Sequence, residues 1–249
     1  TVGTFQAKRA YQIADRFRRR GTAVALGGFH VTFCPDEAAC HADVLALGEA
    51  EGTWPHLIED LRDGQLKPRY QYREPPTLAG IVARREVYAD KRYAPLHVIQ
   101  FGRGCRFRCD FCCVRAFYRS DVRQRPVAEV VAEIEAAGAR RVFFADDNII
   151  ANRAYAKELF AALIPLRITW QSQISIDFID DEPLVKLMRR SGCQVVIIGL
   201  ESLNEQSLRQ MGKGWAARGD YAERLQRIRD QGIMVYGGFV FGYDGDTPD

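Results

Sequence analysis

The sequence predicts an α/β protein in two parts: a partial doubly wound (Rossmann-like) region, followed by an incomplete parallel βα barrel of the partial TIM type. Two observations predict this fold class. In residues 1–64, short apolar strands alternate with amphipathic helices, and glycines follow the strand ends. From residue 96 onward, five strand candidates are separated by helical segments, which is the spacing of a parallel barrel or of part of one.

The first part opens with a helix over 7–20, where apolar residues recur at helical spacing. Gly21 ends this helix, and a short buried strand is predicted over 22–26. Gly27 and Gly28 follow that strand directly, at the end where open α/β sheets bind ligands. The remaining elements are a short helix, a strand and a second helix, over 35–39, 43–47 and 54–61.

A linker is predicted over 65–95, because this stretch is rich in proline, arginine and tyrosine and has no regular hydrophobic period. The barrel part occupies 96–249. Its strand candidates are 97–102, 141–145, 168–174, 194–200 and 233–241. Its main helix candidates lie between these strands, over 126–137, 154–163, 182–190 and 220–230.

The composition excludes several classes of protein. A formal net charge of +3 is too close to neutrality to indicate a nucleic-acid partner. There is neither a signal peptide nor an apolar run of membrane-spanning length, so no transmembrane segment is expected. The seven cysteines are odd in number and clustered, unlike a disulfide framework, and we expect a reducing, cytoplasmic location. Because the chain starts with Thr1 and stops in a turn-like segment, we expect a fragment of a longer protein.

The main functional motif of the barrel part is a loop over 103–112. It carries Cys105, Cys109 and Cys112 in the spacing C-x3-C-x2-C. Three thiolates can hold three corners of an iron–sulfur cube and leave the fourth iron without a protein ligand. Arginines crowd this segment, and their positive charge is expected to lower the thiol pKa. The alternatives are three buried cysteines on one helix face, against which the glycines at the start argue, and a zinc knuckle, which lacks its second cysteine pair.

With Phe111 directly before the last cysteine, this loop resembles the signature of radical S-adenosylmethionine (radical SAM) enzymes. The resemblance implies that Cys105, Cys109 and Cys112 bind a 4Fe-4S cluster, and that Phe111 lies near the adenine of S-adenosylmethionine (SAM). In that family the open iron chelates SAM, and reduction cleaves it to a 5′-deoxyadenosyl radical. Cys113 lies outside the pattern and is not expected to bind iron. The family fold is a six-stranded partial barrel, so the strands predicted here would leave one unpaired edge.

Polar residues at other strands complete the predicted SAM site. Asp146, Asp147 and Asn148 follow the second barrel strand, where the resemblance implies contacts to the methionine amino group and where helix capping is the alternative. Ser172 in the third strand is a candidate for facing a polar cavity. Glu201 follows the fourth strand and resembles the family's Gly-x-Glu-Ser turn, which contacts SAM. Capping of the next segment is the alternative for Glu201.

Residues 10–64 resemble the second half of the cobalamin-binding domain that precedes many radical SAM modules. The resemblance implies that the backbone of Gly27 and Gly28 approaches the nucleotide tail of cobalamin. The family's cobalt-ligating histidine motif belongs to the first half of that domain, which would precede Thr1. His30 lies on a different loop and is expected to be a structural histidine. Cobalamin is therefore expected in a longer parent protein rather than in this chain alone.

The resemblance implies reductive cleavage of SAM, with cobalamin-dependent methylation or related C–H chemistry on a small-molecule or lipid-like substrate. A reductant such as a flavodoxin or a ferredoxin would supply the electron. Three alternatives remain: a radical SAM methylthiotransferase, an iron–sulfur electron-transfer module without SAM chemistry, and a non-catalytic cobalamin-binding remnant. The first of these requires a second cluster, for which Cys34, Cys40 and Cys193 are too scattered in the sequence.

Overall fold

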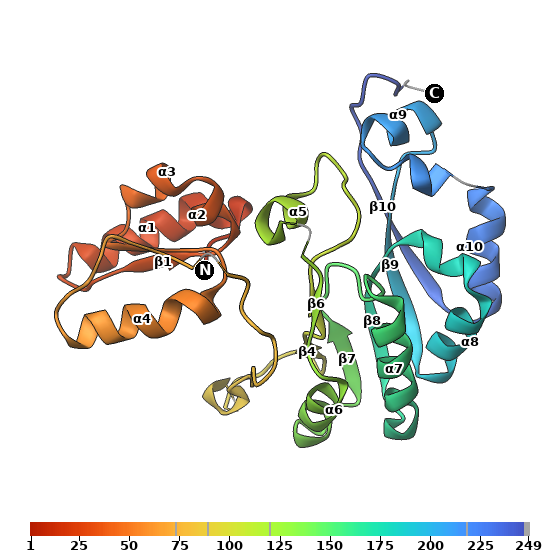
Figure 1. The fold of residues 1–249 in the computed structure, drawn as a ribbon, viewed down its shortest axis with the longest axis horizontal. Coiled ribbons are helices and arrows are strands. Elements are labelled where there is room, and N and C mark those ends of the chain that lie inside the picture. The colour runs from red at the N-terminus through yellow and green to blue at the C-terminus, as the bar shows by residue number, and fades with distance from the viewer. Residues whose placement is uncertain (73, 89, 120, 218, 247–249) are drawn as a thin grey trace. The chain divides into compact units, whose positions relative to one another are not determined.

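The computed structural model describes residues 1–72, 74–88, 90–119, 121–217 and 219–246. The chain divides into two compact units, Thr1–Pro76 and Thr77–Asp249, whose elements are labelled in Figure 1. Each unit has its own main sheet and its own hydrophobic core. Within the described residues, every helix is too short or too polar to cross a membrane.

The first unit is built on a three-stranded parallel sheet in the order β1-β2-β3. Its elements are α1 (Ala7–Arg18), β1 (Ala25–Gly27), α2 (Phe29–Phe33), α3 (Pro35–Ala39), β2 (Val44–Leu47), α4 (Ala50–Arg62) and β3 (Arg69–Gln71). In Figure 1, α1 and α4 lie on opposite sides of this sheet. Every residue of β2 is buried, because alternate side chains face the two helical layers. This is the predicted doubly wound arrangement.

The two faces of this sheet have separate cores. Leu45 of β2 packs in one core with Tyr11 of α1, and Tyr70 of β3 packs in the other with Leu57 of α4. β3 thus belongs to the first unit, although it lies within 65–95, the stretch predicted to be a linker. A three-residue strand with two exposed side chains has no readable hydrophobic period, and only its pairing with β2 defines it.

The second unit contains a five-stranded, all-parallel sheet in the order β4-β7-β8-β9-β10. These strands are β4 (His97–Ile99), β7 (Arg141–Phe144), β8 (Thr169–Ile174), β9 (Cys193–Glu201) and β10 (Met234–Phe239). The longer helices between them are α6 (Val127–Ala136), α7 (Arg153–Leu163), α8 (Glu182–Arg190) and α10 (Tyr221–Asp230). Since the spatial order equals the chain order, each strand–helix unit adds the next strand, as in a partial barrel. The five predicted strands are confirmed.

Alternation along the strands separates a helix-packed face from an open face. Trp170 of β8 is buried and stacks on Phe160 of α7, with 4.9 Å between the ring centroids. Ser172 lies on the same face, is fully buried, and donates to a backbone carbonyl of β7 at 2.9 Å. The predicted cofactor contact of Ser172 does not fit this geometry, because its hydroxyl faces the helix layer. Gln171 and Gln173 occupy the opposite face.

Shorter elements lie near the cysteine loop and at the sheet edge. β5 (Gly102–Arg103) pairs with β6 (Arg123–Gln124) as an antiparallel ladder, and α5 (Cys113–Tyr118) and α9 (Glu205–Gln210) are short helices. Among the described residues, no strand pairs with the outer edge of β10, as the count of predicted strands implied.

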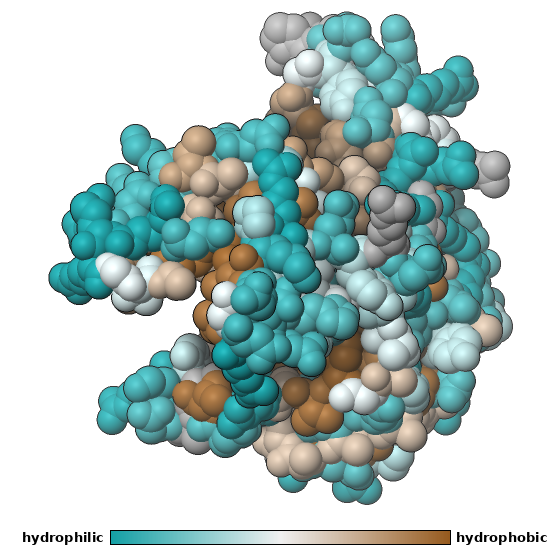
Figure 2. Space-filling model, turned by 60° about the vertical axis from the view of Figure 1, so that its left-hand side comes forward, coloured by the Kyte–Doolittle hydropathy of each residue, from teal (hydrophilic) through white to brown (hydrophobic). Residues whose placement is uncertain are grey.

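Figure 2 shows a mainly hydrophilic face with smaller hydrophobic patches. Large apolar side chains are exposed on β10, among them Met234 and Tyr236.

Candidate functional site

The cysteine loop connects β5 to α5 and contains no regular helix. Cys105, Cys109 and Cys112 all precede α5, whose first residue is Cys113, so the helix-face alternative is wrong. Gly104 has φ 88°, and a Cβ there would come within 1.9 Å of a backbone oxygen of the segment leading to β6. Only glycine allows this close approach. The amide of Cys112 donates to the carbonyl of Cys109 at 3.3 Å, which closes a turn between these two cysteines.

The three thiols are partly exposed and form no disulfide. Burial raises the pKa of both Cys105 and Cys109, and the charge of Cys112 raises each of them further. The sequence-based expectation of a lowered thiol pKa is therefore wrong for these two residues. The positive charge that acts on Cys109 comes from Lys213, whereas Arg106 is bound to a carboxylate elsewhere. A metal would still bind the thiolate form of each cysteine.

Residues that follow α9 hold the other side of the loop. The amide of Asp110 donates to the carbonyl of Met211 at 3.0 Å. The hydroxyl of Tyr243 donates to the carboxylate of Asp110 at 2.9 Å. The Phe107 ring stacks on Trp215, with 3.6 Å between centroids and 10° between planes. These contacts anchor the loop, and its cysteines lie close enough for their charges to interact.

Asp146 and Asp147 fix the start of the loop. The buried carboxylate of Asp146 accepts hydrogen bonds from the amides of Phe101, at 3.0 Å, and Gly102. The carboxylate of Asp147 accepts from the amide of Gly104 at 2.8 Å. Both carboxylates therefore position the backbone just before the first cysteine. The SAM contact implied for Asp146 does not fit its burial, and for Asp147 it remains a prediction.

Burial raises the pKa of Asp146 from 3.8 to about 7, although the two amide donors oppose this shift. The folded chain therefore holds the Asp146 proton more tightly than the unfolded chain. The resulting stabilisation is complete below about pH 4 and is lost as the pH rises toward 7, at about 1.4 kcal/mol per pKa unit. We expect Asp146→Asn to remove this loss, so that the wild type falls in stability relative to the variant between pH 4 and 7. Urea unfolding of the cluster-free chain across this pH range measures the difference.

A suitable control is Asp181→Asn. Although burial opposes it, a hydrogen bond from Lys157 lowers the pKa of Asp181, so its contribution has the opposite sign. The stabilisation that Asp181 contributes is present above the ordinary carboxylate pKa and is lost as the pH falls. If the Asp146→Asn profile runs parallel to that of the wild type, the proposed titration of Asp146 is wrong.

Asn148, which follows β7, contacts the first cysteine of the loop. Its amide nitrogen is 3.7 Å from the Sγ of Cys105 and donates to the Oγ of Ser175 at 3.0 Å. Its Oδ1 accepts from the amide of Ser175 at 3.4 Å. Asn148 thus ties the first cysteine to the end of β8. These bonds do not cap a helix, since Asn152 caps α7.

Glu201 ends β9 with a positive φ of 65°. Its Oε1 accepts from the Nζ of Lys213 at 2.8 Å, and the same Nζ donates to the carbonyl of Gly199 at 2.6 Å. The side chains of Glu201 and Lys213 are only 12% and 8% exposed. A Cβ at Gly199 would lie 2.1 Å from the Glu201 carboxylate, so the Gly-x-Glu spacing has a packing reason. From the sequence alone, Lys213 could equally be a solvated loop residue.

The remaining predicted residues are Phe111 of the cysteine loop and two glycines and a histidine of the first unit. Phe111 is 43% exposed in the turn before Cys112. Gly27 and Gly28 belong to the first unit, where added Cβ atoms would come within 2.9 Å of the chain's own backbone. His30 is buried, with one ring nitrogen near Thr4 and the other near a glutamate. Both ring nitrogens of His30 therefore have a polar partner within the first unit, and its structural role stays a prediction.

The structure thus brings together the three cysteines, Asn148 and Glu201 around the carboxyl ends of the barrel strands. Sequence reasoning gave no role to Asp177, which lies just beyond β8 and binds Arg106 of the cysteine loop. Its position after a predicted strand could have indicated a role at the site, because polar residues that follow parallel strands gather at one face of a barrel. Three thiolates on one ordered loop fit a cluster that leaves one iron open.

Comparison with known proteins gives a consistent family assignment. A family model described as the radical SAM superfamily matches residues 99–249. Bacteriochlorophyllide d C-8(2)-methyltransferase of Chlorobaculum tepidum is 32% identical, over 99% of this chain and 59% of that protein. Bacteriochlorophyllide d C-12(1)-methyltransferase of the same organism is 33% identical, over 99% of this chain and 57% of that protein. The chain therefore spans somewhat more than half the length of these relatives.

Solved structures show the same fold. TsrM from Kitasatospora setae, a radical SAM methyltransferase with cobalamin and a [4Fe-4S] cluster bound, has a TM-score of 0.75 at 19% identity, over 98% of this chain and 56% of that one. OxsB, a cobalamin-dependent SAM radical enzyme with aqua-cobalamin and SAM bound, has a TM-score of 0.70 at 16% identity, over 96% of this chain and 40% of that one. At these identities the likeness concerns the fold alone.

Proposed function

Because the chain belongs to the radical SAM superfamily, we propose that it is the cluster-binding part of a cobalamin-dependent methyltransferase. Cys105, Cys109 and Cys112 hold the 4Fe-4S cluster, and SAM binds over the carboxyl ends of the barrel strands. The observation that supports this most directly is the ordered loop with three partly exposed thiols next to Asn148 and Lys213. The pair of methyltransferase relatives at 32% and 33% identity supports the reaction class.

The protein's own groups would hold and orient these cofactors. When bound, the cluster and SAM supply an electron-transfer and group-transfer chemistry that side chains lack. The three thiolates hold iron, and the amide of Asn148 orients the sulfur of Cys105. The ammonium group of Lys213 partly neutralises Glu201, which would leave the carboxylate able to accept hydrogen bonds without a full unbalanced charge.

The first unit would contribute to cobalamin binding in the longer protein. Gly27 ends β1, Gly28 follows it, and Gly48 follows β2 at the same edge, which is where open α/β sheets bind ligands. The hydroxyl of Thr32 donates to the carbonyl of Gly28 at 2.9 Å and accepts from the amide of Gly48 at 2.9 Å. These bonds tie the backbone that follows β1 to the backbone that follows β2.

The substrate would be a small apolar molecule that contains rings. Two of the relatives are named for bacteriochlorophyllide d, and a hopanoid C-2 methylase of Rhodopseudomonas palustris is 28% identical, over 91% of this chain and 45% of that protein. A flavodoxin or a ferredoxin in a reducing cytoplasm would supply the electron.

The methylthiotransferase alternative is disfavoured, because Cys193 is fully buried in the barrel core and cannot serve a second cluster.

Product analysis of the full-length protein tests the proposal. The protein is reconstituted anaerobically with iron, sulfide and cobalamin, reduced, and supplied with SAM that carries a labelled methyl group. We expect one 4Fe-4S cluster per chain, bound cobalamin, and either 5′-deoxyadenosine or a labelled methyl group on an acceptor. A protein that carries the cluster but consumes no SAM would instead support the electron-transfer alternative.

A further inference from the structure

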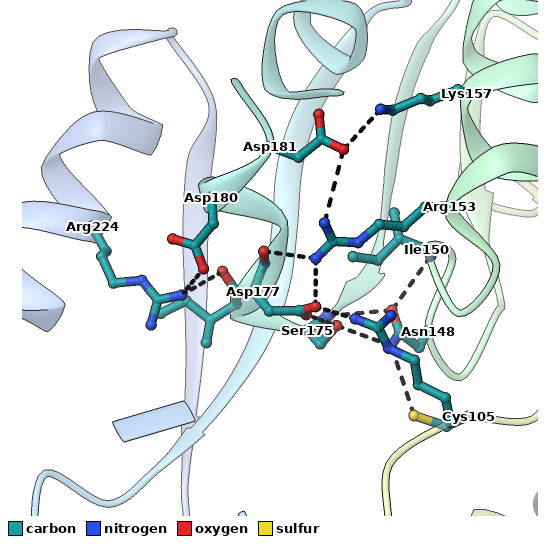
Figure 3. Close-up of polar contacts among 12 residues, drawn as sticks. Cys105, Asn148, Ile150, Arg153, Lys157, Ser175, Asp177, Asp180, Asp181 and Arg224 are labelled. Atoms are coloured by element: carbon teal, nitrogen blue, oxygen red, sulfur yellow. Dashed lines mark hydrogen bonds and ion pairs between the residues drawn. The ribbon is translucent and has the colours of Figure 1, made fainter. Parts of the chain in front are cut away.

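A compact network of charged side chains lies beyond the carboxyl ends of β7 and β8, as Figure 3 shows. Asp177 is at its centre, in the turn Ile176–Asp180 that follows β8. Its Oδ2 accepts from Arg153 of α7 at 2.6 Å and from Arg106 of the cysteine loop. The Arg153 guanidinium also donates to the backbone carbonyl of Asp177 at 2.9 Å. One carboxylate thus joins a barrel helix to the loop.

A second route connects Asp177 to the same loop. Its Oδ1 accepts from the hydroxyl of Ser175. Ser175 in turn accepts from the amide nitrogen of Asn148 at 3.0 Å, and that nitrogen lies 3.7 Å from the Sγ of Cys105. Figure 3 shows this chain of contacts, of which one dashed line reaches the Cys105 sulfur. Asp177 therefore reaches two consecutive loop residues, one through charge and one through a hydrogen-bond chain.

The side chain that binds Arg106 is itself mostly buried and is held by a further ion pair. The Asp177 side chain is only 17% exposed, against 39% for Arg106. Arg153 is also held by Asp181 at 3.8 Å, and Lys157 binds the same Asp181 oxygen at 2.8 Å. Asp177 and Arg153 are thus fixed by several bonds to residues outside the cysteine loop. Arg106 is the member of the network that belongs to the loop. Charge-assisted hydrogen bonds of this kind are stronger than neutral ones.

We infer that Asp177 is a positioning residue for the iron–sulfur cluster: through Arg106, and through Ser175 and Asn148, it holds the first cysteine in place before iron binds. The inference rests on the proposed cluster and concerns only how this chain prepares the site. Ordering a free loop costs conformational entropy, and a loop that is already anchored avoids part of this cost when iron binds. Partners of metal ligands commonly change metal affinity by about 10- to 100-fold.

Cluster retention in single variants tests the inference. Wild type, Asp177→Asn and Arg106→Gln are reconstituted anaerobically, and the release of iron to a chelator is followed by absorbance. We expect both variants to release iron about tenfold faster than the wild type, on the scale seen for partners of metal ligands. Arg106→Lys should restore part of the retention. The double variant should be no worse than Asp177→Asn alone, because Asp177→Asn already removes the partner of Arg106.

The matched control is Asp180→Asn. Asp180 lies in the same turn but pairs with Arg224 of α10 at 3.1 Å rather than with the loop. Iron release from this variant should stay within about twofold of the wild type, since no loop contact is lost. The inference fails if Asp177→Asn and Arg106→Gln retain iron as the wild type does, or if Asp180→Asn loses it equally fast. If the wild type takes up no iron at all, the proposed function itself fails and the inference with it.

Discussion

Replacing any one of Cys105, Cys109 or Cys112 with alanine is expected to prevent stable assembly of the cluster. Each would supply the thiolate for one iron, and the fourth iron already has no protein ligand in the proposed site. Removing a further thiolate leaves two irons without protein ligands. We expect anaerobic reconstitution of these variants to give little bound iron or sulfide and to lack the visible absorbance of a 4Fe-4S cluster. Iron and sulfide analysis per chain measures this.

Cys113→Ala is the sharpest control for this prediction. Cys113 directly follows Cys112 but is exposed and is the first residue of α5. Its removal should leave the cluster intact, as should Cys34→Ala, Cys40→Ala and Cys193→Ala. Loss of iron from any of these four variants would show that the ligand assignment is incorrect.

Parts of this site could be predicted from the sequence because they depend on local pattern. The βα spacing gave the strands, and the cysteine spacing together with the neighbouring glycines gave a non-helical loop. Gly104 illustrates the limit of this reasoning. Its presence signalled a break in the helix, but the contact that demands glycine is with a backbone oxygen of a segment beyond α5. Such a contact can be found only once the chain is folded.

The roles of individual polar residues depended on neighbours that are distant in the sequence. Ser172 and the adjacent glutamines could not be assigned to faces until the pairing of β8 with β7 fixed the register. Asp146 was expected to contact a ligand, but its partners are the amides of Phe101 and Gly102, more than 40 residues earlier. The thiol pKa was misjudged because burial, which the sequence does not reveal, is the largest influence on the pKa of Cys105 and raises it.

Lys213→Met is expected to destabilise the cluster-free chain by about 3–5 kcal/mol, the range found when one partner of a buried ion pair is removed. The substitution leaves the carboxylate of Glu201 in a site that is only 12% exposed, without its counter-charge. It also removes the donor to the carbonyl of Gly199. Urea unfolding of the variant and the wild type measures the difference. Lys186→Met is the matched control, because Lys186 and its partner Glu182 are more than 60% exposed, and it should unfold close to the wild type.

The double variant Lys213→Met, Glu201→Gln separates the ion pair from simple loss of packing. If the cost of Lys213→Met comes mainly from an unpaired carboxylate, neutralising Glu201 should recover much of it, and the two single effects should sum to more than the double effect. Additive effects would show that the two charges do not stabilise each other. The pair matters for the site because Lys213 also acts on the thiol of Cys109. A strong coupling would therefore mean that the lysine whose charge acts on the Cys109 thiol is also the counter-charge that the end of β9 needs.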